Sequence, residues 1–252
     1  MRHLTRRFAF VLLLGTAMVA AAAPAHAQAS SSTGPWSVDF AIGWDNDIAG
    51  NINSSAIGTL NNQAVVILKN TYEEVYGTGL QLRGGLGYRL PNSTRELRLA
   101  VTFQSLDADY VTPLGDIGVS NLYAQYSDYQ AFLVDFGMRQ NHDFTDRFTG
   151  YGEGFIGLGF VDKIDATLVA PGTNLIRQAN DLYDQSVAFS VGANGGVLFK
   201  QNDHLGVFLQ LGFRYVSGLS EVDDLVGTGL DTMNDKSSRW TVPFLAGIKY
   251  SF

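Results

Sequence analysis

The sequence contains no cysteine, so a disulfide framework and a Cys-ligated metal site are both excluded. Only 16% of its residues are charged. After residue 28 no apolar run approaches the roughly 20 residues that a membrane-spanning helix needs. What it does contain, 28 Gly, 11 Tyr and 16 Phe, is typical of a β protein that is either soluble or embedded in a membrane as a barrel.

The first residues have the pattern of a signal peptide. Arg2, Arg6 and Arg7 precede an apolar run over 8–23, and small residues surround His26. This pattern predicts cleavage before Gln28. A membrane anchor is the alternative, but the run is short and Ala-rich and no stop-transfer charges follow it. We therefore expect a cleaved segment over 1–27 and a single domain over 28–252.

Removal of this segment leaves an acidic chain. The segment holds three Arg and no acidic residue, so 14 basic residues remain against 24 acidic ones, a formal charge of −10. Nucleic-acid binding needs clustered Lys and Arg to neutralise phosphates. The charge balance therefore argues against DNA or RNA as a partner.

Strict alternation of apolar and polar residues is the strongest signal in the chain. In the last segment one face of the predicted strand is apolar throughout: Trp240, Val242, Phe244, Ala246, Ile248, Tyr250 and Phe252. The same period occurs in seven earlier segments: 36–44, 79–90, 96–104, 132–139, 151–160, 187–200 and 206–215. A β-sandwich would explain this alternation as well as a barrel would.

The lengths of the connections favour a membrane barrel. Short turns over 91–94, 141–146 and 201–203 alternate with long loops over 45–73, 106–121, 162–184 and 217–238. Three short turns and four long loops fit an all-β, antiparallel up-and-down transmembrane barrel of eight strands. Both termini and the turns would then lie in the periplasm, and the four long loops would be extracellular.

Aromatic residues fall where the two membrane boundaries should be. Trp36 and Trp44 would stand roughly 20 Å apart along the membrane normal in a tilted strand, close to the height of the apolar band. We expect Trp44, Tyr215 and Trp240 at the outer interface. The inner interface would carry Trp36, Tyr88, Tyr250 and Phe252.

The signal peptide, the eight amphipathic strands and the ending Tyr250-Ser251-Phe252 resemble the small eight-stranded outer-membrane β-barrel proteins, which include the transmembrane domain of OmpA and porin-like relatives. The resemblance implies a location in the cell outer membrane and contact with its lipid and lipopolysaccharide. It also implies that the barrel-assembly machinery reads Phe252. Pro243 departs from the pattern because it lacks a ladder donor. We expect it near the outer end of the last strand or at a bulge.

Charges of both signs occupy the opposite, inward faces of the predicted strands. They are Asp39, Arg83, Glu96, Arg98, Asp135, Glu153, Arg214 and Lys249. An eight-stranded barrel is just wide enough for side chains to fill it, and buried ions must pair. We interpret the set as a salt-bridged plug in a structural, surface-interacting protein. The alternative is a narrow porin for ions or small solutes, whose ion pairs exchange partners.

Catalysis has little support in the sequence. After signal cleavage only His142 and His204 remain, both expected in periplasmic turns, and no Gly-x-Ser-x-Gly segment is present. We expect neither an enzyme nor a cofactor. The long loops are acidic, with Asp107, Asp109 and Asp116 in one of them, so a Ca²⁺ or Mg²⁺ site is an alternative to a solvated surface. The EF-hand spacing is absent, and no metal ligand is assigned.

Two apolar stretches lie inside predicted loops, over 63–69 and 164–169. Each must pack somewhere: as an extension of a barrel strand, over the barrel mouth, or as a binding surface. If both crossed the membrane, the barrel would have ten strands. The sequence names no extracellular partner.

Overall fold

The computed structural model describes residues 34–252 apart from 61, 110, 172–174, 223–228 and 235–236. The predicted signal peptide lies outside these described residues. Eight antiparallel strands form a closed barrel in the order β1-β16-β15-β14-β11-β10-β7-β6. They are β1 (Trp36–Ala49), β6 (Thr78–Arg89), β7 (Arg95–Leu106), β10 (Tyr129–Asp143), β11 (Phe148–Val161), β14 (Ser186–Lys200), β15 (Leu205–Val216) and β16 (Arg239–Ser251). The prediction of eight strands is confirmed, and the ten-strand alternative is wrong.

The barrel has its apolar face outside. Along β1, Ser37, Asp39 and Ala41 are buried, whereas Phe40 and Ile42 are 42% and 51% exposed. Successive side chains of a strand point to opposite faces, so the polar set fills the interior and the apolar set covers the exterior. This is the reverse of a protein that folds in water.

The strands run further than the sequence pattern indicated. β1 continues past Trp44 to Ala49, so Asp45 and Asp47 belong to the barrel wall and not to a loop that begins at residue 45. β10 spans Tyr129–Asp143, which leaves 144–147 as the turn. Pro243 lies within β16 opposite Asp45, and the β15–β16 pairing skips Val242 and Pro243 because proline cannot donate to the ladder.

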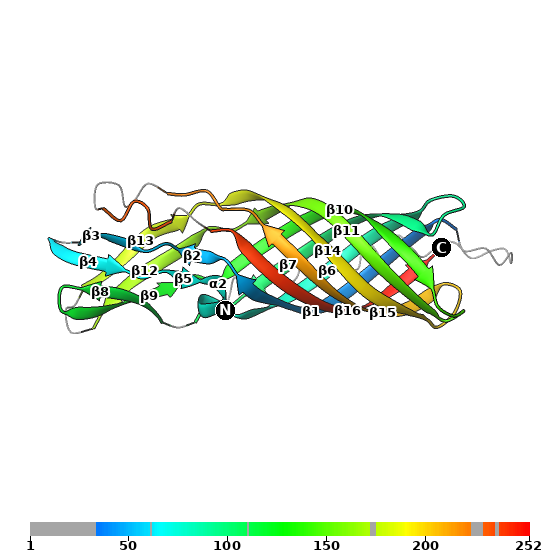
Figure 1. The fold of residues 1–252 in the computed structure, drawn as a ribbon, viewed down its shortest axis with the longest axis horizontal. Coiled ribbons are helices and arrows are strands. Elements are labelled where there is room, and N and C mark those ends of the chain that lie inside the picture. Colours follow the sequence, from blue (N-terminus) through cyan, green and yellow to red (C-terminus); the bar gives the residue numbers. More distant parts are fainter. Residues whose placement is uncertain (1–33, 61, 110, 172–174, 223–228, 235–236) are drawn as a thin grey trace, which may run out of the picture.

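Three of the four long segments contain β-strands that continue the barrel at one end, and the described residues of the fourth contribute one isolated bridge between Glu221 and Tyr183. We call residues 50–77, 107–128, 162–185 and 217–238 the outer extension. A six-stranded sheet in the order β13-β12-β9-β8-β4-β3 forms most of it. Its strands are β3 (Ala56–Leu60), β4 (Gln63–Ile67), β8 (Thr112–Ile117), β9 (Ser120–Tyr126), β12 (Ile164–Ala170) and β13 (Leu175–Tyr183). Figure 1 shows this sheet at the left and the barrel at the right.

A smaller pair, β2 (Asn51–Asn53) and β5 (Asn70–Thr71), joins β1 to the sheet and leads into the one-turn helix α2 (Tyr72–Val75). Thr71 caps this helix: the Glu74 N–H donates to its hydroxyl, and its own N–H donates to the Glu74 carboxylate. The cap fixes Tyr72 and Val75, which are fully buried. Among the described residues, no helix is long and apolar enough to cross a membrane.

The main apolar core lies at the junction of the barrel and the extension. It begins on the ends of the barrel strands with Leu106, Tyr129 and Val161 and continues through Val65 and Leu122 of the extension. Apolar side chains thus form the core of the extension, whereas the barrel below it contains the buried charged side chains and a small apolar cluster of Ala41, Tyr151, Phe208 and Leu245. The apolar stretches that begin at residues 63 and 164 form β4 and β12 and pack into this core.

Candidate functional site: the charged barrel interior

The barrel interior contains equal numbers of buried acidic and basic side chains. Twelve charged side chains form this set, and none of them is more than 5% exposed. The six acidic residues are Asp39, Asp45, Asp47, Glu96, Asp135 and Glu153, and the six basic ones are Arg83, Arg98, Arg139, Arg214, Arg239 and Lys249. Each of them takes part in a salt bridge with a member of opposite sign. The set has no net formal charge.

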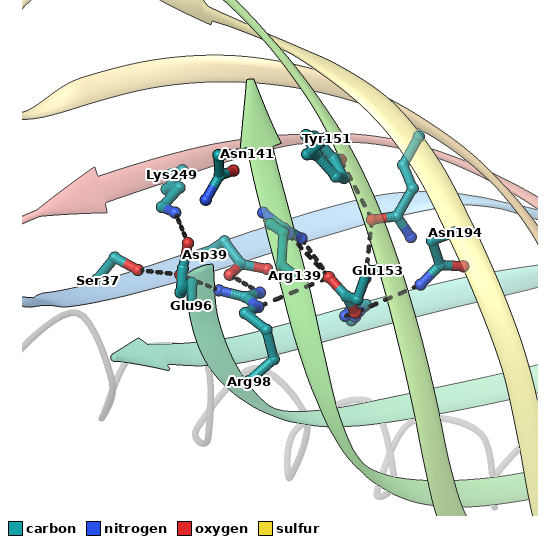
Figure 2. A network of polar contacts seen from close by, with 12 residues as sticks. Ser37, Asp39, Glu96, Arg98, Arg139, Asn141, Tyr151, Glu153, Asn194 and Lys249 are labelled. Carbon is teal, nitrogen blue, oxygen red and sulfur yellow. Dashed lines mark hydrogen bonds and ion pairs between the residues drawn. The ribbon is translucent and has the colours of Figure 1, made fainter. Parts of the chain in front are cut away.

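Glu96 is the centre of the ion pairs and hydrogen bonds nearest the short turns. Lys249 Nζ lies 2.6 Å from its Oε2, and Arg98 Nη1 lies 3.1 Å from its Oε1. The Ser37 hydroxyl donates to the same Oε1 at 2.8 Å, and the other amino group of Arg98 pairs with Asp39. Figure 2 shows these side chains converging from separate strands.

Glu153 is the second centre of the network. Its Oε1 accepts from Arg83 Nη2 at 2.6 Å, and its Oε2 accepts from Arg139 Nε at 2.9 Å and Nη2 at 2.6 Å. Arg98 Nε, at 3.8 Å, connects this centre to the Glu96 group. The Arg139 guanidinium also stacks 4.0 Å from the centre of the Tyr151 ring. The Glu153 carboxylate is therefore held in place by several partners from different strands.

Two glycines, Gly85 and Gly87, leave room for these contacts. A Cβ atom at Gly87 would lie 1.8 Å from Glu96 Oε1 and 2.5 Å from Ser37 Oγ. One at Gly85 would lie 2.6 Å from Arg98 Nη2. Both glycines face the interior of β6, so the carboxylate and the guanidinium occupy the space that a larger residue would take.

Asp135 and Arg214 form a separate bidentate pair. Arg214 Nη1 lies 3.0 Å from Asp135 Oδ1, and Nη2 lies 2.7 Å from Oδ2. Ser190 accepts a further hydrogen bond from Nη1 at 2.7 Å, and the Phe155 ring centre lies 4.6 Å from the guanidinium. The paired forks of carboxylate and guanidinium give this contact its geometric specificity.

A third group lies at the end of the barrel that carries the extension. Arg239 Nη2 lies 3.0 Å from Asp45 Oδ2, and Arg239 Nε lies 2.5 Å from Asp47 Oδ1. Gln104 accepts from Arg239 Nη1 at 3.1 Å and donates to Asp45 at 2.7 Å. The Tyr129 ring centre is 4.5 Å from the guanidinium. Here the charged interior gives way to the apolar core.

Buried tyrosines connect separate segments of the outer extension to one another. The Tyr72 hydroxyl donates to the Ser237 carbonyl at 3.0 Å, and that of Tyr76 donates to the Ser127 carbonyl at 2.9 Å. Tyr126 donates to the Asn53 side chain at 2.9 Å. Burial in the apolar core raises the pKa of Tyr72, Tyr76 and Tyr126 above the ordinary phenol value.

All eight charges named from the sequence point into the barrel. The structure also brings in Asp45, Asp47, Arg139 and Arg239. Their signal was the same alternation: Arg139 shares the inward face of β10 with Asp135, and Asp45 and Asp47 continue the inward face of β1. Arg239 precedes the outward-facing Trp240.

The predicted interface aromatics lie at the two ends of the barrel exterior. Trp36 and Tyr88 pair with ring centres 4.8 Å apart, and Tyr250 and Phe252 pair at 5.3 Å beside the short turns. At the other end Tyr215 and Trp240 pair at 4.6 Å. Trp44 lies in the half of β1 nearer the extension and stacks on Phe244, with ring centres 6.2 Å apart.

Between these aromatic groups the exterior is apolar, with Phe136, Leu158 and Phe213 each 45–56% exposed. A closed barrel satisfies its backbone groups internally, and an apolar exterior with a polar interior is the arrangement for lipid. The chain is an eight-stranded outer-membrane β-barrel. The short turns are its periplasmic end, and the outer extension is its extracellular end.

No protein-family model matches the chain, and neither does any curated protein. Among solved structures, Neisserial surface protein A has 12% identity and a TM-score of 0.45, covering 88% of this chain and 99% of that one. The outer-membrane protease OmpT from Escherichia coli has 12% identity and a TM-score of 0.44, covering 88% and 100%. Ail, the attachment invasion locus protein of Yersinia pestis, has 12% identity and a TM-score of 0.35, covering 88% and 100%. At these values the likeness says nothing about activity.

The two histidines of the barrel stand apart from its charged interior. His142 is exposed at the periplasmic end of β10 and packs edge-on against Phe144, with ring centres 5.1 Å apart. His204 lies in the β14–β15 turn, with Nδ1 2.8 Å from the Ser251 carbonyl oxygen. In the described part of the chain, no group of three or more His, Cys, Asp or Glu side chains could hold a metal ion.

Proposed function

We propose that this barrel has a structural and surface-interaction role, with its lumen closed by paired charges and its extension presented outside the cell. The balance of the buried charges carries the proposal: six acidic and six basic side chains, each in an ion pair. Breaking a buried pair costs about 3–5 kcal/mol when one partner is left uncompensated. A permeating ion would have to separate several such pairs in turn.

A second barrier lies above the ion pairs. The apolar core that includes Leu106, Tyr129 and Val161 covers the outer end of the lumen. A hydrated ion or sugar leaving the polar interior would have to cross tightly packed apolar side chains, where an unpaired charge is strongly disfavoured. The two barriers in series support a closed barrel over a narrow porin.

We further propose that the role is non-enzymatic. The only histidines among the described residues lie at the periplasmic end, and neither has a hydrogen-bonded nucleophile. The charged groups of the interior are committed to one another, so none is free to act on a bound substrate. The proposed contacts of the exterior are outer-membrane lipid and lipopolysaccharide, which its apolar surface and aromatic rings suit.

The C-terminal strand is proposed to be read by the barrel-assembly machinery. Phe252 N–H donates to the Trp36 carbonyl at 3.0 Å, and β16 pairs with β1 to close the barrel. The final residue therefore meets the first strand at the closing seam.

The proposal of a closed lumen can be tested in lipid vesicles. We expect vesicles loaded with the refolded protein to swell no faster in isotonic arabinose or KCl than vesicles without protein. A general porin in the same vesicles provides the positive control. Swelling that increases with the amount of folded barrel would favour the porin alternative.

A further inference from the structure

An exposed apolar ridge lies on the outer face of the extension. Ile57 on β3 and Val66 on β4 are direct cross-strand partners, and Leu68 follows Val66 on the same face. Their exposed fractions are 76%, 40% and 54%. Adjacent exposed apolar side chains outside the membrane mark an interaction surface more often than scattered ones do.

Carboxylates flank this ridge on both sides. Asp116 on β8 is the direct cross-strand partner of Val66 and is exposed. On the other side residues 229–233 lie beside the free edge of β3: a Cβ at Gly229 would lie 3.1 Å from the Ile57 carbonyl oxygen, and the Ser54 N–H donates to the Met233 carbonyl at 2.7 Å. Asp231, two residues further along, is exposed. In Figure 1 the ridge strands β3 and β4 lie at the end of the molecule farthest from the barrel.

The charge of the extension as a whole has the same sign. Its four segments contain 15 acidic residues and 4 basic ones, a formal charge of −11 against −10 for the whole chain after residue 27. Lys69, directly after Leu68, is the one basic residue of the 50–77 segment. The negative electrostatic potential of the extension attracts cationic partners and repels anionic surfaces.

The spacing of the ridge fits an amphipathic helix. Val66 lies on β4, and Leu68 lies one residue beyond the end of that strand at Ile67; two residues of extended chain span roughly 6.6 Å, and the cross-strand step from Val66 to Ile57 is about 5 Å. Apolar side chains at positions i and i+4 of a helix stand about 6 Å apart. We propose that the ridge binds a basic amphipathic helical segment of another polypeptide, with its apolar stripe on Ile57, Val66 and Leu68 and its Lys or Arg side chains toward Asp116 and Asp231.

This proposal rests on the proposed surface-interaction role and names the chemistry of the partner. The test uses the full mature chain in nanodiscs of phosphatidylcholine, because a zwitterionic lipid does not itself attract a cationic peptide. The probe is a labelled Leu/Lys peptide of about four helical turns with a helical apolar period. A scrambled peptide of the same composition lacks the stripe, and a Leu/Glu peptide reverses the charge.

We expect the Leu/Lys helix to bind at least about tenfold more tightly than the scrambled peptide, with an affinity that falls as salt rises. Ile57→Ser with Val66→Ser should weaken binding about tenfold. Asp116→Asn with Asp231→Asn should weaken it about threefold at low salt. As matched controls, Val169→Ser on β12 and Asp107→Asn with Asp203→Asn should bind like the unmodified protein. Heat-modifiable migration on gels verifies that each variant is folded.

Equal binding of the scrambled peptide, or unchanged binding by both ridge variants, would overturn the proposal. It would also be overturned if the protein formed dimers that the Ile57→Ser and Val66→Ser changes abolish, because a second copy would then occupy the ridge. None of these results bears on whether the lumen is closed, because the vesicle-swelling experiment tests that separately. A failure of the peptide test with vesicles that still do not swell leaves the closed barrel standing.

Discussion

Arg83 on β6 and Glu153 on β11 meet inside the barrel, with Arg83 Nη2 2.6 Å from Glu153 Oε1. Two strands, β7 and β10, separate them in the sheet, so the contact spans the lumen and does not join neighbours. Both side chains are almost completely buried. The pair therefore braces opposite parts of the wall while it blocks the space between them.

Replacement of Glu153 by Gln should destabilise the barrel strongly. Arg83 and Arg139 would then lose their carboxylate, and we expect a loss of about 3–5 kcal/mol in the free energy of unfolding. Urea unfolding in lipid vesicles measures it. Asp143→Asn is the control, because the carboxylate that pairs with Lys200 is 60% exposed and its loss should cost less than about 1 kcal/mol. Equal effects of the two substitutions would contradict the account of the buried pairs.

The glycine that accommodates Glu96 should not tolerate a methyl group. Gly87→Ala would place a Cβ within 1.8 Å of Glu96 Oε1 and should displace the carboxylate from Lys249 and Arg98. We expect slower refolding and a lower urea midpoint. Gly152→Ala provides the comparison on the barrel exterior, where a Cβ would meet nothing within 4 Å, and it should leave both quantities nearly unchanged. A Gly87→Ala barrel as stable as the Gly152→Ala one would show that the Glu96 contacts are dispensable.

The buried tyrosines predict the behaviour of the extension in alkali. Burial raises the pKa of Tyr72, Tyr76 and Tyr126 above the value of about 10 that applies in the unfolded chain. The unfolded state therefore loses protons first, so their contribution to stability is complete below about pH 10 and decreases as the pH rises further. Tyrosinate absorbance of the folded protein should rise in two stages, the later one together with loss of the extension's structure. A single transition near pH 10 for all 11 Tyr would contradict this assignment.

The terminal aromatic should matter for assembly in cells. Phe252→Ser should reduce the amount of heat-modifiable protein in the outer membrane severalfold, because the residue directly follows the strand that closes the barrel and its N–H donates to the Trp36 carbonyl. Phe144→Ser tests another periplasmic phenylalanine, which is 65% exposed in the β10–β11 turn. Equal levels of the two variants would argue against recognition of Phe252.

The barrel was predictable from sequence because one physical rule acts on every strand: lipid outside and a polar interior force a period of two. At the outer end of the first strand the same alternation continues beyond the predicted boundary, to Ala49. Ending the first strand at Trp44 hid Asp45 and Asp47, although both keep the inward alternation and pair with Arg239.

The outer extension was less predictable. Its strands are short, and their pairing depends on contacts between segments far apart in the chain, such as Tyr72 with Ser237 and Tyr183 with Ile52. Sequence alternation shows that β4 and β12 bury one face, but the single core that they share arises only when all four segments meet. The ridge likewise depends on β3, β4 and β8 lying side by side.

Single-channel recording in planar bilayers tests the closed lumen most directly. With the purified, folded chain inserted at moderate voltage and neutral pH, the ion pairs around Glu96, Glu153 and Asp135 predict a quiet membrane with no steady current above baseline. A stable, reproducible conductance that scales with inserted protein would contradict the account, because ions could then pass without separating the buried charges.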